Sequence, residues 1–168
     1  MNRIERLREV PDAAWKTAPS RLPARIAGAA LRDPGRVWLM SRMAAAYIAV
    51  SVLARLLPLP RAFAHLSPRL RSQAGDQRRT DAIVNALDTL LTAGIPFIHP
   101  QCWRRAAVLH RFLRLEGMDT VIVLGVRMEG PRTVEAHAWI ERSGQPFAEA
   151  VETAAYRRVF EFPAGPAS

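Results

Sequence analysis

Three side chains with complementary chemistry, Cys102, His137 and Glu149, follow one another in the C-terminal half of the sequence. Cys102 is the chain's single cysteine. A cysteine nucleophile needs a thiol that attacks, an imidazole that takes and returns the proton, and a carboxylate that orients the imidazole. We therefore interpret Cys102, His137 and Glu149 as a candidate catalytic triad.

The sequence around these residues predicts the elements that must bring them together. An apolar helix begins near Cys102 and ends at Gly117, so the thiol would meet the unpaired N–H groups of a first helical turn, which stabilise a thiolate and can hold an oxyanion. Residues 120–128 are rich in β-branched side chains and predict a buried strand, and residues 134–141 alternate as its hairpin partner. A shorter strand at residues 146–150 would carry Glu149 beside His137. The expected fold class is α+β, a cysteine-bearing helix packed on a small antiparallel sheet.

The composition limits the other kinds of site. The chain has 168 residues, of which 49% are hydrophobic, enough for a buried core. A single cysteine excludes an intrachain disulfide and a zinc site built from several cysteines. His99 and His110 could be imagined with Cys102 as metal ligands, but their spacing matches no strong zinc pattern, and His65 has no supporting context. The sequence contains no glycine-rich phosphate loop, so we expect neither a metal nor another cofactor.

Positive charge is concentrated in the first half of the chain. Residues 1–80 carry 14 Arg and Lys16 against five acidic residues, whereas residues 81–168 carry nine Arg against ten acidic residues. Such a basic half can attract an acidic partner, which could be nucleic acid, anionic lipid or an acidic peptide. It can equally be a solvated arginine-rich surface.

An apolar segment at residues 37–57 is the strongest candidate for a membrane span. Arg42 and Arg55 leave only 12 residues between them, fewer than the roughly 20 that cross a bilayer. We therefore predict a buried or partner-binding helix that Pro58 and Pro60 end. With no signal peptide recognised at residues 1–9, the expected location is cytoplasmic.

A composition change after this helix suggests how the chain is divided. Residues 61–79 mix arginines with proline, glycine and small polar residues, which favours a surface connector. We expect a basic, apolar helical region at residues 1–79, a catalytic domain at residues 80–162 that starts with a helix capped by Thr80, and a tail at residues 163–168.

Several segments of the predicted catalytic domain also carry a family resemblance. They are Cys102 at a helix start, Leu115-Glu116-Gly117-Met118, Leu124-Gly125-Val126-Arg127, and Ala136-His137-Ala138-Trp139-Ile140-Glu141 followed by Gly144. Over roughly residues 80–160 the chain resembles the transglutaminase-like leader peptidases of lasso-peptide biosynthesis, in their stand-alone B-type form without a fused recognition domain. The resemblance implies a papain/transglutaminase-like core and a cysteine protease that removes the leader from a ribosomally made precursor.

The resemblance also carries residue roles and partners. Cys102 and His137 correspond to the nucleophile and the base. The wider superfamily usually has Asp where this chain has Glu149, and Glu152 is a rival for that role. Trp103 stands where a smaller aliphatic residue is common in the family. The implied partners are the precursor peptide, a separate leader-recognition protein docking on the basic, apolar N-terminal half, and the macrolactam cyclase, without nucleic acid or membrane. The alternative is a non-catalytic binding scaffold or an acyltransferase on the same core.

Overall fold

The described chain folds into a layer of helices packed on a four-stranded antiparallel sheet. The structure is a computed structural model and describes residues 33–70, 76–95, 98–130 and 132–163. The helices are α2 (Pro34–Leu56), α3 (Leu59–Leu66), α4 (Gln77–Thr92), α5 (Cys102–Leu115) and the short 3₁₀ helix η2 (Thr153–Ala155). The strands are β1 (Val121–Met128), β2 (Val134–Arg142), β3 (Gln145–Phe147) and β4 (Arg157–Phe162), in the order β3-β2-β1-β4. The predicted α+β class is confirmed.

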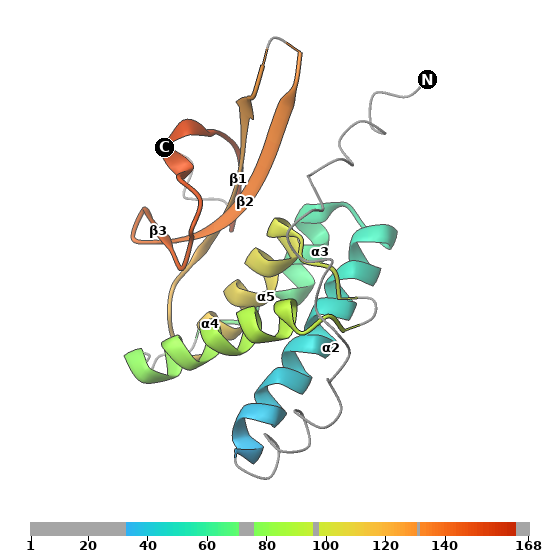
Figure 1. Cartoon of the computed structure of the whole chain (residues 1–168), viewed down its shortest axis with the longest axis vertical. Helices are drawn as coiled ribbons and strands as arrows, with labels where there is room; N and C mark the ends of the chain where they lie inside the picture. Colours follow the sequence, from blue (N-terminus) through green and yellow to red (C-terminus); the bar gives the residue numbers. More distant parts are fainter. Residues whose placement is uncertain (1–32, 71–75, 96–97, 131, 164–168) are drawn as a thin grey trace.

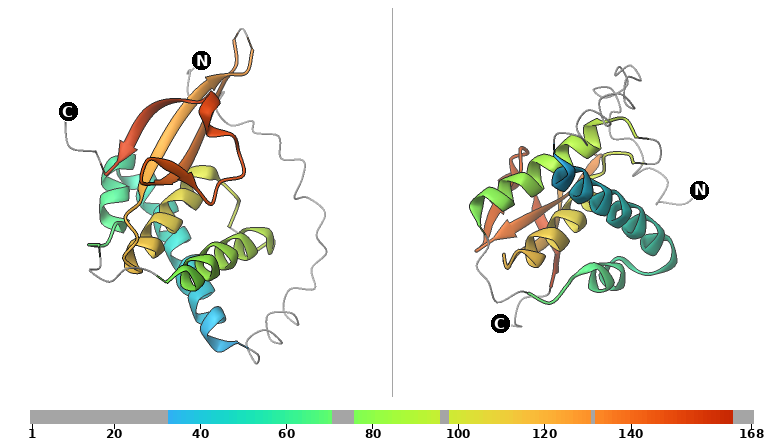
Figure 2. Two further views of the ribbon diagram at one scale, coloured as in Figure 1. Left: turned by 90° about the vertical axis from the view of Figure 1, so that its left-hand side faces the viewer. Right: turned by 90° about the horizontal axis from the view of Figure 1, so that it is seen from below.

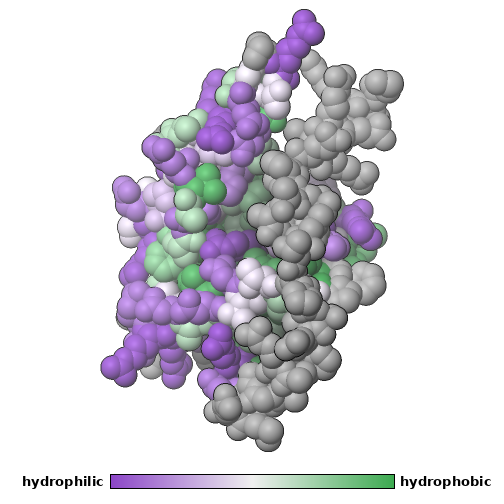
Figure 3. All heavy atoms as spheres, viewed as in Figure 1, coloured by the Kyte–Doolittle hydropathy of each residue, from purple (hydrophilic) through white to green (hydrophobic). Residues whose placement is uncertain are grey.

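Helix α5 lies at the centre, between the sheet and the other helices (Figures 1 and 2). One buried cluster joins α2, α3, α4 and α5 to the inner face of the sheet, where Ala138 and Ile140 point. A second, smaller cluster of Val123, Trp139 and Tyr156 forms on the opposite face. Alternate residues of β2 thus enter different clusters, as the period of two in residues 134–141 predicts. Hydrophilic side chains predominate over the described residues on the face seen in Figure 3.

The sequence of α5 explains both its packing and its end. Ala106, Leu109 and Leu113 follow helical spacing and are buried, as predicted. Gly117 adopts φ +80°, a left-handed conformation that favours glycine, and Met118 N–H then donates to the carbonyl of Leu113. The helix therefore begins with the thiol at Cys102 and ends at the glycine, with its apolar face in the core.

Helix α2 confirms the helix predicted in the apolar segment. The side chain of Asp33 accepts from the N–H of Arg36, and Pro34 occupies the first turn, where its missing N–H costs nothing. One face of α2 is buried through Met43, Ala46, Tyr47 and Val50. The other exposes large apolar side chains, namely Trp38, Ile48, Val52 and Leu56. By length and composition alone α2 could cross a membrane, but a single such helix near the N-terminus is weak evidence for a span.

Two sequence predictions about the following segment were wrong. The expected connector contains α3, because Pro58 and Pro60 end α2 and also start a new helix at positions that need no N–H donor. Phe63 anchors α3 in the core. The next helix begins at Gln77 and is capped by Asp76 instead of Thr80, whose hydroxyl donates to the Asp76 carbonyl.

The predicted division after residue 79 falls inside α4 (Gln77–Thr92), and the helices before and after it share one core. The cluster containing Tyr47 and Phe63 also contains Leu87 and Leu109. A separate N-terminal region remains a prediction, and the parts of it at residues 1–32, together with most of the predicted tail, lie outside the described residues.

We predict that α2 contributes directly to the free energy of unfolding. Val50→Ala removes two methyl groups from a side chain that is 0% exposed, and should lower the free energy of unfolding by about 2 kcal/mol. The matched control Val52→Ala makes the same exchange on the same helix at 49% exposure, and should change it by less than about 0.5 kcal/mol. Urea unfolding of the full chain followed by circular dichroism measures both. Equal losses would contradict a core role for α2.

Candidate active site

Cys102 is the first residue of α5 and is half-buried. The preceding Gln101 does not cap the helix with its side chain, so the N–H groups of the first turn remain available to a charged group. The thiol lines a groove of about 590 Å³ together with His137, Glu149, Arg105 and Asp88. The structure therefore brings the three predicted site residues into one groove.

His137 lies between the thiol and the carboxylate. Its Nε2 is 3.5 Å from Oε2 of Glu149, an ion-pair contact longer than a close hydrogen bond. The two side chains are only 15% and 8% exposed. The imidazole also interacts with the side chain of Cys102.

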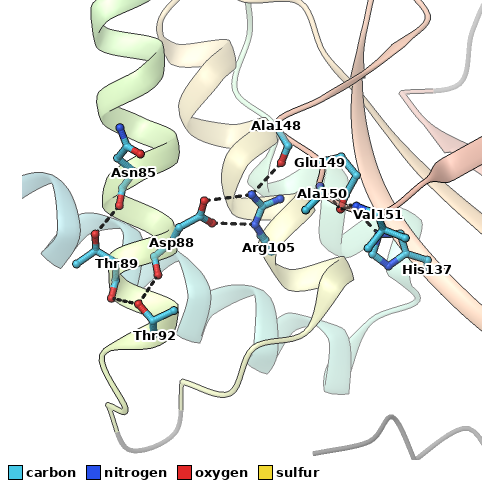
Figure 4. A network of polar contacts seen from close by, with 10 residues as sticks. All are labelled: Asn85, Asp88, Thr89, Thr92, Arg105, His137, Ala148, Glu149, Ala150 and Val151. Atoms are coloured by element: carbon cyan, nitrogen blue, oxygen red, sulfur yellow. Dashed lines mark hydrogen bonds and ion pairs between the residues drawn. The ribbon is translucent and has the colours of Figure 1, made fainter. Parts of the chain in front are cut away.

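Glu149 reaches His137 from a turn and not from the predicted strand. Strand β3 ends at Phe147, and Ala148 adopts φ +52°, a conformation outside the β region, which takes Glu149 off the strand. One carboxylate oxygen, Oε1, accepts from the N–H groups of Ala150 and Val151, which leaves Oε2 to face the imidazole (Figure 4). The predicted strand at residues 146–150 is therefore confirmed only in its first part, as β3, and its extension through Glu149 was wrong, although the pairing with His137 that it was meant to explain is present.

Glu152, the rival carboxylate, lies elsewhere. It is exposed and precedes η2 as its N-cap residue. Among the described residues, the carboxylate that pairs with His137 belongs to Glu149.

Each of the three groups shifts the pKa of its neighbours in the direction that favours their charged forms. Burial raises the pKa of the Cys102 thiol, but the side-chain interaction with His137 and the N–H groups of Ala138 and Trp103 outweigh it, and the pKa is lowered. Cys102 first and Glu149 second raise the pKa of His137 to about 9. Burial also raises the pKa of Glu149, yet His137 and the N–H of Val151 bring it below its ordinary value. At neutral pH these directions favour a thiolate, an imidazolium and a carboxylate.

Two aromatic rings support His137 on the outer face of the sheet. Its ring lies 6.1 Å from Trp139 at an interplanar angle of 16°, and 5.6 Å from Tyr156. Gly125, the register partner of His137 on β1, makes room for both rings. A Cβ at Gly125 would come within 2.8 Å of Trp139 and of Tyr156. The absence of a side chain at Gly125 therefore lets Trp139 and Tyr156 pack where they contact the imidazole.

Two positioning contacts near Cys102 are absent from the sequence predictions. The hydroxyl of Tyr47, fully buried in α2, donates to the carbonyl of His99 just before the cysteine. Arg105, one turn after Cys102, pairs with Asp88 on α4 and donates to the carbonyl of Ala148. Because residues three apart on a helix lie on the same face, the sequence could have predicted that Arg105 shares the helix face of Cys102. Nothing in the local sequence pairs Tyr47 with residue 99.

The contacts of His110 are structural in character. His110 is buried between the hydroxyls of Ser67 at 2.9 Å and Thr120 at 3.0 Å, and burial, followed by the charge of Arg114, lowers its pKa to about 4. It is therefore neutral at physiological pH. Within the described residues no group of three or more His, Cys, Asp or Glu side chains could hold a metal ion.

The sequence also matches a known protein family over the region that forms the site. A sequence model described as the transglutaminase-like superfamily matches residues 40–161. The match begins inside α2 and ends in β4, so it takes in every side chain of the candidate site. No significant match was found among curated proteins or among solved structures.

We predict that Cys102 is alkylated by iodoacetamide at pH values where an ordinary thiol is not. The midpoint of the alkylation rate against pH should lie below that of an ordinary cysteine thiol, because the pKa of the Cys102 thiol is lowered. In His137→Ala the midpoint should rise, since burial then acts without the opposing imidazole. His65→Ala, on α3, is the control and should leave the midpoint unchanged. An ordinary midpoint in the wild type would contradict the ion pair.

Proposed function

The chain belongs to the transglutaminase-like superfamily, and we propose that it is a cysteine peptidase that removes the leader from a ribosomally synthesised lasso-peptide precursor. That superfamily includes cysteine proteases. The single observation that carries the peptidase proposal is the contact of His137 with Glu149 in the groove that also holds Cys102. Thiol, base and orienting acid then have the arrangement that peptide-bond hydrolysis through a thioester requires.

Each charged group has a step in this proposal. The thiolate of Cys102 attacks the carbonyl carbon at the end of the leader, and the first-turn N–H groups of α5 stabilise the oxyanion. The imidazolium of His137 gives its proton to the departing amine of the core peptide, so the C–N bond breaks and a thioester remains. Neutral His137 then takes a proton from water, which hydrolyses the thioester and releases the leader with a free carboxylate. Glu149 keeps Nε2 protonated, so that Nδ1 is the atom that exchanges the proton.

The substrate class rests on the sequence resemblance. The segments around Leu124-Gly125-Val126-Arg127 and Ala136-His137-Ala138-Trp139 resemble stand-alone leader peptidases of lasso-peptide biosynthesis. The family form that this chain resembles has no fused recognition domain, so we infer that a separate leader-recognition protein presents the long leader. The exposed apolar side chains of α2, among them Trp38 and Leu56, offer that protein a docking face. The macrolactam cyclase then acts on the released core peptide, and we place the reaction in the cytoplasm.

Cleavage of the precursor should require Cys102. With the cognate precursor and its recognition protein, Cys102→Ala should lower the cleavage rate by about 10³-fold or more, because no other group can form the thioester. Mass spectrometry of the products measures the loss and identifies the leader end. A free carboxylate on the leader indicates hydrolysis, whereas an amide indicates acyl transfer. Unchanged cleavage by Cys102→Ala would refute the proposal.

The third member of the triad should be Glu149. In Glu149→Gln the amide oxygen can keep the N–H groups of Ala150 and Val151, which turns the NH₂ group toward protonated Nε2 and removes the orienting acceptor. We expect kcat to fall by between about 10² and 10⁴-fold. Glu152→Gln is the matched control and should retain wild-type kcat, because Glu152 is exposed. The reverse ranking would transfer the role to Glu152.

A further inference from the structure

The turn that carries Glu149 is held by an arginine of the cysteine-bearing helix. Arg105 is 23% exposed, and its Nε and Nη2 contact Oδ1 and Oδ2 of Asp88 at 3.0 and 3.4 Å. The same Nη2 donates to the carbonyl of Ala148 at 2.9 Å. The guanidinium therefore joins α4, α5 and the turn after β3 (Figure 4).

The turn needs such a contact because its backbone is strained. Ala148 has φ +52°, a left-handed conformation that is unfavourable for alanine and persists only where neighbouring groups hold it. The bonds from Ala150 and Val151 to Glu149 are internal to the turn and fix only its shape. The contact of Arg105 with Ala148 fixes the turn against α5, and hence against the thiol.

Asp88 determines where the guanidinium points. A carboxylate that takes two N–H groups of an arginine fixes the plane of its fork, and the remaining N–H direction then meets the carbonyl of Ala148. Asp88 and Arg105 both line the groove that contains Cys102 and His137. They lie beside the reacting groups without a direct contact to the sulfur or the imidazole among the described hydrogen bonds.

We propose that Arg105, oriented by Asp88, is a positioning residue that holds the turn at residues 148–151 so that Glu149 stays against His137. The proposal deepens the proposed function and rests on it, since the position of Glu149 matters to catalysis only if His137 is the base. The direction in which the pKa of His137 changes when Arg105 is replaced distinguishes a positioning role from a purely electrostatic one. Loss of a nearby cation alone would raise the pKa of an imidazolium, whereas displacement of the Glu149 carboxylate would lower it.

The titration of His137 in the full chain, followed by NMR of its imidazole Cε1–H group, tests the proposal. The His137 signal is assigned by its absence in His137→Ala. In Arg105→Gln we expect the pKa of His137 to fall by about one unit from its raised value, because the opposing carboxylate moves away. Asp88→Asn should lower it in the same direction. Arg105→Lys keeps the positive charge but loses the two-pronged guanidinium contact with Asp88 and Ala148, so it should also lower the pKa of His137, by less than Arg105→Gln does.

Arg114→Gln is the matched control on the same helix. Arg114 is 14% exposed, pairs with Asp119 at 2.8 Å and donates to the carbonyl of Pro68 at 3.2 Å. It resembles Arg105 in its contacts but lies nine residues further along α5, about 14 Å along the helix axis. Its loss should lower thermal stability without moving the titration of His137.

The outcome is decided by the sign of the shift. A folded Arg105→Gln variant in which the His137 pKa is unchanged or raised would overturn the proposal. If that variant does not fold, Arg105→Lys decides in the same way. The titration needs no substrate, so failure of the proposed function would appear separately, as absence of precursor cleavage by the wild-type chain.

Discussion

The site depends on one imidazole held between a thiol and a carboxylate. His137 stands in the middle of β2, with Nε2 3.5 Å from Oε2 of Glu149, and its ring also interacts with the side chain of Cys102. Each neighbour raises the pKa of the ring, to about 9, and the ring in turn lowers the pKa of both neighbours. Burial disfavours the charged forms of Cys102 and Glu149, so displacing any one of the three groups also makes the charged forms of the other two less favourable.

The rest of the fold keeps these three groups in register. Helix α5 carries the thiol at its first residue, buries its apolar face in the core and sends Arg105 to the turn that bears Glu149. Strand β2 carries His137 against the rings of Trp139 and Tyr156, which Gly125 leaves room for. Helix α2 reaches the same region through Tyr47, which holds the chain just before the cysteine. Helices before and after residue 79 therefore contribute to one site.

Sequence patterns predicted the elements better than the contacts between them. The hydrophobic period and the glycine stop located α5, and alternation assigned the two faces of β2. The three candidate residues were recognisable because a lone thiol, an imidazole and a carboxylate occur in the order that a triad needs. Helix α3 was missed because Pro58 and Pro60 were treated only as helix ends, although proline is also favoured in a first turn.

The errors near the site have a common physical cause. The bend at Ala148 depends on a left-handed residue that is not glycine, and its stabilising contact comes from Arg105, 43 residues earlier. The hydrogen bond from Tyr47 to His99 spans 52 residues. Such long-range contacts leave no local periodicity, so a strand was predicted where a turn is held from outside.

The proposed function requires that Cys102 carry the leader as a thioester. Mass spectrometry of the intact protein, mixed with precursor and its recognition protein and quenched in acid within the first turnover, tests this directly. We predict an added mass equal to the leader acyl group, located by proteolysis on the peptide that contains Cys102 and discharged by hydroxylamine. Release of the core peptide without any acyl adduct on Cys102, under conditions where deacylation limits the rate, would contradict it.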